Sequence, residues 1–168
     1  MNSAIQTGVV SSFRGDYSFL SNHYTAVFEW RNETFFCGEQ AFQYAKTFYP
    51  DPNIMMSDAK CHDMAKRLRD TGSGKVAKRY GREVPVDIEF WNAHKVQLMR
   101  EIVHAKFSTS DDNLVGKLIN TGAMLLVEGN DWGDKFWGRC LDKSTGQMVG
   151  LNTLGVILME ERGLWLRG

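Results

Sequence analysis

The sequence lacks most of the features that assign a chain to a broad functional class. Basic and acidic side chains number 20 each, so no net charge favours nucleic acid or a membrane surface as a partner. No apolar run approaches the roughly 20 residues of a membrane-spanning helix. The N-terminus also lacks the basic-then-apolar layout of a secretory signal. We therefore expect a soluble protein of the cytoplasm that does not bind a membrane.

Cysteine is scarce, and its placement predicts neither a disulfide framework nor a zinc site. The three cysteines are odd in number and far apart, and none forms a CxxC pair: Cys37, Cys61 and Cys140. We expect free thiols, as in a reducing compartment. The four histidines form no HExxH motif and no Cys/His cluster, so surface or core positions are expected for His23, His62, His94 and His104. No metal site and no cofactor are predicted.

Internal repeats, low-complexity segments and Pro/Gly/Ser-rich linkers are absent as well. The length of 168 residues and the hydrophobic content of 43% are ordinary for one globular domain. We predict a single domain over residues 1–168, with its core in about 13–165. The expected fold class is α+β, predominantly helical with a small antiparallel β-sheet.

Local patterns place the elements of this fold. Aromatic and β-branched residues from Tyr24 to Phe36, interrupted by Arg31-Asn32, predict a hairpin, because Asn tolerates the positive φ of tight turns. The run Met124–Val127 predicts a short buried strand. Apolar spacings of three and four, with capping residues, predict helices from Gly38 to Pro50, Ser57 to about Asp70, Lys75 to Tyr80, Asp87 to Phe107, after Asp111-Asp112, and Thr153 to about Arg162.

Two phosphate-binding patterns fail near residue 74. A P-loop ending at Gly74-Lys75 needs Gly at position 69 and Ser or Thr at 76, where the chain has Arg69 and Val76. Gly72-Ser73-Gly74 matches a relaxed dinucleotide fingerprint, but it follows a predicted helix rather than a strand. Neither motif is therefore assigned.

Two segments near the N-terminus combine polar and aromatic residues. Residues 13–22 (FRGDYSFLSN) form a predicted loop whose Ser and Asn side chains are suited to hydrogen-bond a ligand. Residues 38–46 (GEQAFQYAK) form a predicted helix on which Glu39, Gln43 and Lys46 lie in one polar row. Glu39 falls in the first turn, where the helix dipole favours a carboxylate. A solvated helix face is the simpler interpretation of this row.

Two further regions in the second half of the chain are candidates. Residues 128–138 (EGNDWGDKFWG) combine acids, glycines and indoles, which suits ligand binding or a turn-rich loop that docks two core indoles. The start of the last helix, at Gly150-Leu151-Asn152, offers N–H groups to a phosphate. Trp91 and Lys95 lie one turn apart, either as a stacking and phosphate pair or as a lysine stem on an indole.

Taken together, these segments resemble the NADAR, or YbiA-like, family. The resemblance runs from Phe13 to about Arg162. Its pieces are, in order, Phe13 with Leu20-Ser21-Asn22; Gly38-Glu39 with Phe42-Gln43 and Lys46; Trp91, Lys95, Met99 and Lys106-Phe107; Val127-Glu128 with Asp134 and Trp137-Gly138; and Asn152-Thr153-Leu154-Gly155 with Leu158-Met159. The insert Gly129–Gly133 departs from the commonest family pattern, and residues 50–80 match poorly.

This resemblance implies an N-glycosidase that acts on ribosylated bases. The first expected substrate is guanine carrying ADP-ribose, in nucleic acid or nucleotides. Cleavage at the anomeric carbon passes through an oxocarbenium-like state, which needs a nearby carboxylate and an activated water. Glu39 is the first candidate for that carboxylate and Asp134 the second. The remaining roles are orientation by Glu128, stacking by Trp132 and Trp137, and diphosphate binding by Lys46 and Arg14. Ser21, Asn22, Gln43, Trp91, Lys95, Gly150 and Asn152 complete the predicted substrate contacts.

Three other functions fit the same residues. One is hydrolysis of phosphoribosylamino-pyrimidine intermediates of riboflavin synthesis. Another is a non-catalytic sensor that binds ADP-ribose or NAD derivatives. A third is an interaction domain without a ligand. Glu39 and Asp134 together favour catalysis, and the sequence predicts no oligomeric state.

Overall fold

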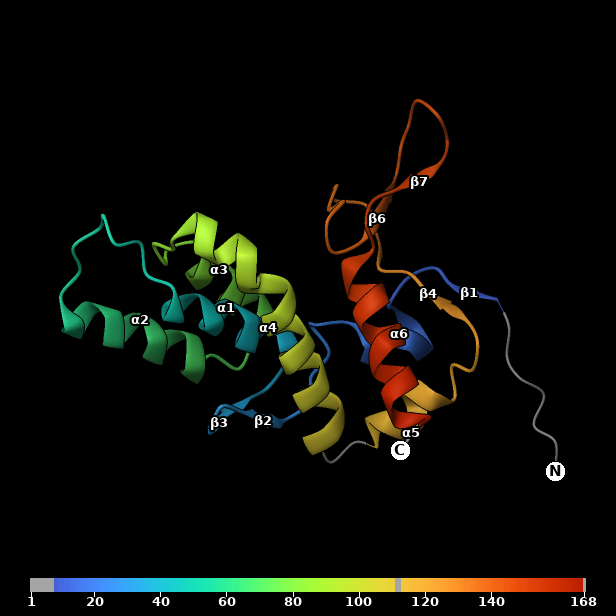
Figure 1. Ribbon diagram of the computed structural model, residues 1–168, viewed down its shortest axis with the longest axis horizontal. Helices are drawn as coiled ribbons and strands as arrows, with labels where there is room; N and C mark the ends of the chain where they lie inside the picture. Colours follow the sequence, from blue (N-terminus) through green and yellow to red (C-terminus); the bar gives the residue numbers. More distant parts are fainter. Residues whose placement is uncertain (1–7, 111–112, 168) are drawn as a thin grey trace. The chain divides into compact units, whose positions relative to one another are not determined.

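The computed structural model describes residues 8–110 and 113–167, and these fall into two compact units (Figure 1). Unit 2 contains the described residues from Asn22 to Ser110. Unit 1 contains those up to Ser21 together with those from Asn113 onward. The prediction of an α+β fold dominated by helices is confirmed. No helix in the described ranges is long and apolar enough to cross a membrane.

Unit 2 begins with the predicted hairpin. Strands β2 (Phe28–Trp30) and β3 (Glu33–Phe35) pair antiparallel, with Trp30 opposite Glu33. Both turn residues, Arg31 and Asn32, have positive φ, as a tight two-residue hairpin requires. The hairpin buries Phe28 and Phe35, whose rings lie 6.1 Å apart. The turn was therefore predicted correctly.

Four α-helices complete unit 2: α1 (Gly38–Ala45), α2 (Asp58–Asp70), α3 (Gly74–Gly81) and α4 (Ile88–Thr109), with a 3₁₀ turn, η2, over Lys46–Phe48. The capping residues explain two of the starts, because Ser57 accepts a hydrogen bond from the Lys60 N–H and Asp87 from the Phe90 N–H. Helix α1 packs against the other three helices. Two members of its polar row, Glu39 and Gln43, are buried.

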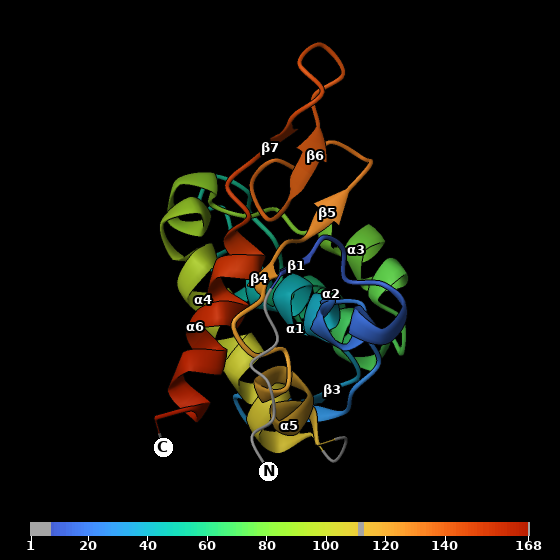
Figure 2. The same ribbon diagram turned by 90° about the vertical axis from the view of Figure 1, so that its right-hand side faces the viewer.

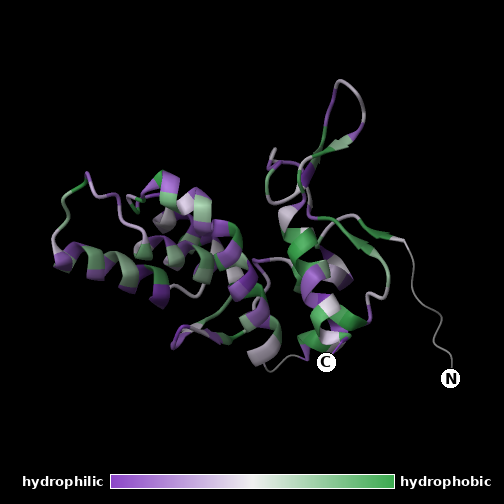
Figure 3. Cartoon of the chain, in the orientation of Figure 1, coloured by the Kyte–Doolittle hydropathy of each residue, from purple (hydrophilic) through white to green (hydrophobic). Residues whose placement is uncertain are grey.

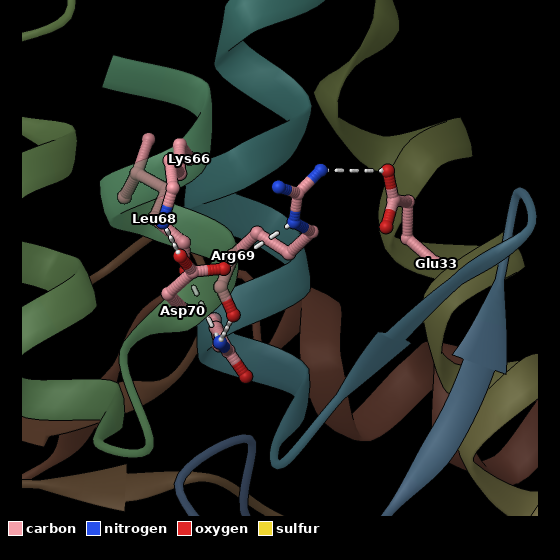
Figure 4. Close-up of polar contacts among 6 residues, drawn as sticks. Glu33, Lys66, Leu68, Arg69 and Asp70 are labelled. Carbon is pink, nitrogen blue, oxygen red and sulfur yellow. Dashed lines mark hydrogen bonds and ion pairs between the residues drawn. The ribbon is translucent and has the colours of Figure 1, made fainter. Parts of the chain in front are cut away.

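Polar contacts hold the end of α2 to β3 and to α1. Arg69 donates from Nη1 to Glu33 on β3 at 3.1 Å, and its Nε lies 3.4 Å from Asp70, which also bonds Lys66 (Figure 4). On α1, the fully buried Gln40 accepts from the Phe36 N–H and donates to the carbonyls of Leu68 and Arg69. Because Gln40 adjoins Glu39, these bonds also fix the first turn of α1.

Unit 1 is built from short strands and two helices. Strands β1 (Val9–Val10) and β4 (Leu125–Leu126) pair parallel; β5 (Gly129–Asn130), β6 (Arg139–Leu141) and β7 (Met148–Val149) form a second sheet, parallel at β5–β6 and antiparallel at β6–β7 (Figure 2). The chain therefore has several small sheets of mixed pairing, where one antiparallel sheet was expected. The buried strand predicted at Met124–Val127 is reduced to two residues, with Leu126 buried and Leu125 exposed.

The helices of unit 1 are α5 (Leu114–Ile119) and α6 (Thr153–Trp165), preceded by a 3₁₀ helix, η1, over Gly15–Leu20. Helix η1 lies in the segment predicted as a loop. The predicted caps Asp111 and Asp112 lie outside the described residues. Asn113 caps α5 instead, from a left-handed backbone position. Figure 3 shows α6 as largely apolar, and it packs against α5 and β4.

Candidate functional site

The carboxylate of Glu39 is held at the start of α1, within unit 2. Its backbone N–H donates to the Asn22 carbonyl at 2.8 Å, which ties the first turn of α1 to the Leu-Ser-Asn segment. The residue is only 8% exposed. The simpler interpretation of a solvated helix face is therefore wrong for Glu39. A carboxylate this enclosed needs specific partners, because burial penalises an unpaired charge.

Two side chains approach the two oxygens of Glu39. The Gln43 amide donates to Oε1 at 2.8 Å, across the one-turn spacing that the sequence predicted. His23 Nε2 lies 3.9 Å from Oε2. One carboxylate oxygen is thus oriented by a buried amide, and the other faces the His23 imidazole. The bond from Gln43 holds the carboxylate in one orientation, as a positioned acid–base group requires.

His23 lies beside Glu39, although the sequence predicted only a surface or core position for it. Its side chain is 45% exposed and borders a hollow of about 210 Å³ that Cys37, Gly74 and Lys75 also line. Burial raises the pKa of the neighbouring Cys37 thiol, so this cysteine stays protonated at neutral pH. The sequence signal for His23 was its position directly after Asn22, the last residue of the polar segment 13–22.

Lys46 lies about one turn beyond Gln43, directly after α1 and at the start of η2. Its ammonium donates to the Gly81 carbonyl at 2.9 Å and lies 5.9 Å from the centre of the Trp91 ring. Burial lowers the pKa of Lys46, and the nearby charge of Glu39 opposes that shift. Lys46 therefore belongs to the predicted polar row, and its hydrogen bond is directed to the end of α3.

The predicted pair of Trp91 and Lys95 is not organised around a ligand. Trp91 is only 8% exposed and packs against Phe42, with ring centres 5.0 Å apart. The Lys95 ammonium donates to Asn92 on the same helix at 2.7 Å. Trp91 thus acts first as a core residue that backs α1. Its indole has little exposed surface on which a ligand could stack.

Asp134, the second acidic candidate, lies in unit 1 and organises a turn. Its Oδ1 accepts hydrogen bonds from the N–H groups of Phe136 at 3.0 Å and Trp137 at 2.9 Å. Asn130 closes the same turn, since its side chain accepts from the Asp134 N–H and donates to the Asp134 carbonyl. Both side-chain bonds of Asp134 fall on a single oxygen. A structural role and a chemical role for the carboxylate are therefore compatible.

The indoles of this loop differ in their exposure. Trp132 is 58% exposed, so it is not the core indole that the packing interpretation required. Trp137 is half-buried and meets Phe136 edge-on, with ring centres 5.0 Å apart. Trp132 thus presents a flat surface to solvent, as a stacking residue would.

Arg14 and residues 129–131 come together at a pocket of about 560 Å³ in unit 1. The Arg14 guanidinium lies 3.9 Å from Asp131, and both side chains are largely exposed. The volume is within the range of small-molecule sites. The other lining residues are mostly apolar, namely Val9, Leu125, Val127, Leu141 and Met148, with Ser11, Ser12 and Arg139.

At the start of α6, the N–H groups that were predicted to bind a phosphate are already hydrogen-bonded within the protein. The N–H groups of Thr153 and Leu154 donate to the carbonyls of Phe136 and Trp137. The Asn152 side chain is 4% exposed, accepts from the Glu128 N–H and donates to the Leu126 carbonyl. Gly150 has φ +138, and its carbonyl accepts from Arg139 Nε at 3.3 Å. The N–H groups of the two residues that follow, Leu151 and Asn152, donate to the carbonyls of Lys135 and Gly138. Gly150 and Asn152 therefore hold unit 1 together.

Three predicted contacts remain, namely Ser21, Asn22 and Glu128. Ser21, in unit 1, ends η1 through a bond from its N–H to the Ser18 carbonyl. Asn22, in unit 2, donates to Met99 Sδ at 3.2 Å and lies against Gly38. Glu128 is half-buried beside Gly138. The structure thus gathers Asn22, Glu39, Gln43 and Lys46 within unit 2, and Arg14 with the 128–138 segment within unit 1.

Comparison with known proteins extends over both units. The model of the NADAR domain matches residues 10–164. The solved structure of the E. coli protein YbiA superimposes with a TM-score of 0.72 at 27% identity, covering 98% of this chain and 88% of that one. An N-glycosidase of Nostoc punctiforme is 44% identical over 72 residues. That match spans 43% of this chain and 42% of the relative's length.

Proposed function

From the premise that this chain belongs to the NADAR family, we propose that it is an N-glycosidase that hydrolyses the bond between a base and ADP-ribose. The proposed substrate is guanine carrying ADP-ribose, in nucleic acid or as a nucleotide. The observation that carries this proposal is the buried Glu39 carboxylate, oriented by Gln43 and facing His23. The N-glycosidase of Nostoc punctiforme supports the reaction class.

The proposed chemistry follows from the reaction at the anomeric carbon. As the N-glycosidic bond breaks, positive charge builds on the ribose ring, and a fixed negative charge next to it lowers the barrier. Glu39 supplies that charge, or removes a proton from the attacking water. Its burial strengthens the interaction, because few water molecules compete with it. Gln43 keeps the carboxylate in place while the charge develops.

Residues of both units have proposed substrate roles. In unit 1, Asp134 is the second catalytic carboxylate, Glu128 orients it, and Trp132 offers its exposed indole for stacking. Trp137 has the same proposed role with less exposed surface. Arg14, at the rim of the 560 Å³ pocket, is a candidate for the diphosphate.

In unit 2, Lys46 and Asn22 are the proposed polar contacts beside Glu39. We place the protein in the cytoplasm, where its three free thiols are stable. The proposed partner is the ribosylated base alone, with no cofactor.

The test is incubation of the full chain with a guanine-ADP-ribosylated oligonucleotide, followed by mass spectrometry. We expect loss of the ADP-ribosyl mass from the oligonucleotide and release of free ADP-ribose. A parallel reaction contains the phosphoribosylamino-pyrimidine intermediate of riboflavin synthesis. If only that compound were cleaved, the protein would still be an N-glycosidase, but guanine carrying ADP-ribose would not be its substrate. Binding of ADP-ribose without cleavage of either compound would indicate a sensor and overturn the catalytic proposal.

A further inference from the structure

The Gln43 amide lies between Glu39 and α3, and only its nitrogen makes a hydrogen bond among the described residues. Gln43 is 6% exposed, and its Nε2 donates to Glu39 Oε1 at 2.8 Å. Its own Oε1 is buried and accepts no hydrogen bond from the residues that the structure describes. Turning the amide over would set Oε1 against the Glu39 carboxylate, where two acceptors repel. The bond to Glu39 therefore fixes which way the amide faces, and it leaves the amide oxygen buried without a hydrogen bond from the described residues.

Gly81, the last residue of α3, is what this amide oxygen faces. A Cβ at position 81 would lie 2.0 Å from Gln43 Oε1, 2.8 Å from Cδ and 3.0 Å from Gln43 Cβ. The first distance is far inside van der Waals contact. The carbonyl of Gly81 also accepts the hydrogen bond from Lys46 at 2.9 Å. One residue of α3 thus contacts two members of the polar row on α1.

The backbone gives no separate reason for glycine at this position. The φ angle of Gly81 lies outside the left-handed region, and the residue is helical. Alanine forms helices better than glycine, so local propensity alone would favour it. The missing side chain is needed only for the close approach to Gln43.

We propose that Gly81 is a positioning residue that acts through Gln43 on Glu39. The absence of a side chain leaves the space in which the Gln43 amide holds the Glu39 carboxylate. The inference rests on the proposed function, because it assigns to Gly81 the alignment of the catalytic carboxylate. A side chain at position 81 displaces the amide, and Glu39 then loses its orienting donor while substrate contacts made elsewhere persist.

The test compares Gly81→Ala with Gly163→Ala in the full chain, using the guanine-ADP-ribosylated oligonucleotide. Gly163 is a matched control, because it is helical in α6 and its added Cβ would meet only Arg167 Nη1 at an ordinary 3.6 Å. We expect kcat to fall by about 10- to 100-fold in Gly81→Ala with KM little changed, since displacement of about 1 Å has that effect on catalysis. Gly163→Ala should match wild type in both constants.

A double-variant cycle separates positioning from general damage to the fold. If Gly81 acts through Gln43, then Gly81→Ala should lower kcat no further in a Gln43→Ala background. Gln43→Met keeps the volume of the side chain and removes the donor, so it should lower kcat by itself even if Gly81→Ala fails to fold. Three results would each overturn the inference. The first is a kcat for Gly81→Ala equal to that of Gly163→Ala, and the second is additive effects of Gly81→Ala and Gln43→Ala in the double variant. The third is full kcat in Gln43→Met. An inactive wild-type protein would instead overturn the proposed function, and the inference with it.

Discussion

At the scale of single residues, the proposed chemistry depends on polar side chains that are buried, chiefly Glu39 and Gln43. The spacing of Glu39, Gln43 and Lys46 was enough to predict that they share one face of a helix, and the Glu39–Gln43 hydrogen bond confirms it. Their burial could not be predicted, because it depends on α3 packing against α1. His23 was missed for a related reason. Its approach to Glu39 is set by the bond between Asn22 and the start of α1, which is not visible as a sequence motif.

Asp134 is the residue at which a structural and a catalytic role have to be separated. We predict that Asp134→Ala lowers the free energy of unfolding by about 1 kcal/mol, since two backbone N–H groups lose their acceptor, as in loss of a helix cap. Asp134→Asn keeps an acceptor oxygen, so its stability should stay close to wild type. Because it removes the charge, its kcat should fall by about 100-fold. Urea unfolding and steady-state kinetics on both variants check this, and normal turnover in a stable Asp134→Asn variant would remove Asp134 from catalysis.

At the scale of elements, the helices were predictable and the strands largely were not. Ser57 and Asp87 mark the starts of α2 and α4 through hydrogen bonds made within the same turn, so a local pattern was sufficient. Strands β4 and β5 are two residues long, and their partners β1 and β6 lie elsewhere in the chain. Such pairing leaves no period in the sequence. The start of α6 was predicted as a helix but misinterpreted as a phosphate site, because the carbonyls that occupy its N–H groups come from the 135–138 loop.

Asn152 joins the start of α6 to β4 and to Glu128, and its substitution should be among the most destabilising in unit 1. It has φ 56, and its amide bonds the backbone of Glu128 and Leu126 while almost fully buried. We predict that Asn152→Ala lowers the free energy of unfolding by about 2–4 kcal/mol, from two lost hydrogen bonds and a left-handed backbone. The comparison is Asn113→Ala, at a position that has φ 49 and is exposed; there the variant loses the hydrogen bond from the Gly116 N–H. In urea titrations, equal losses in the two variants would contradict the role assigned to Asn152.

At the scale of the whole molecule, the family model covers residues from both compact units. The single domain over residues 1–168 remains our proposal. Unit 1 is assembled from two stretches of chain separated by the whole of unit 2, so bringing its two parts together closes a long loop at a cost in chain entropy. We predict one cooperative unfolding transition, with equal calorimetric and van't Hoff enthalpies. Two resolved transitions in scanning calorimetry would show that the units fold independently.

The central claim is that Glu39 performs the chemistry, and the Glu39→Gln variant tests it most directly. Glutamine keeps the size and an acceptor for Gln43 but removes the negative charge. We predict an unfolding transition like that of wild type, unchanged affinity for ADP-ribose in calorimetry, and kcat on the guanine-ADP-ribosylated oligonucleotide lowered by about 10²–10⁴-fold. Glu89→Gln is the matched control, since Glu89 also lies in the first turn of a helix but is exposed, and it should keep full turnover. Undiminished turnover in a folded Glu39→Gln variant would contradict the account.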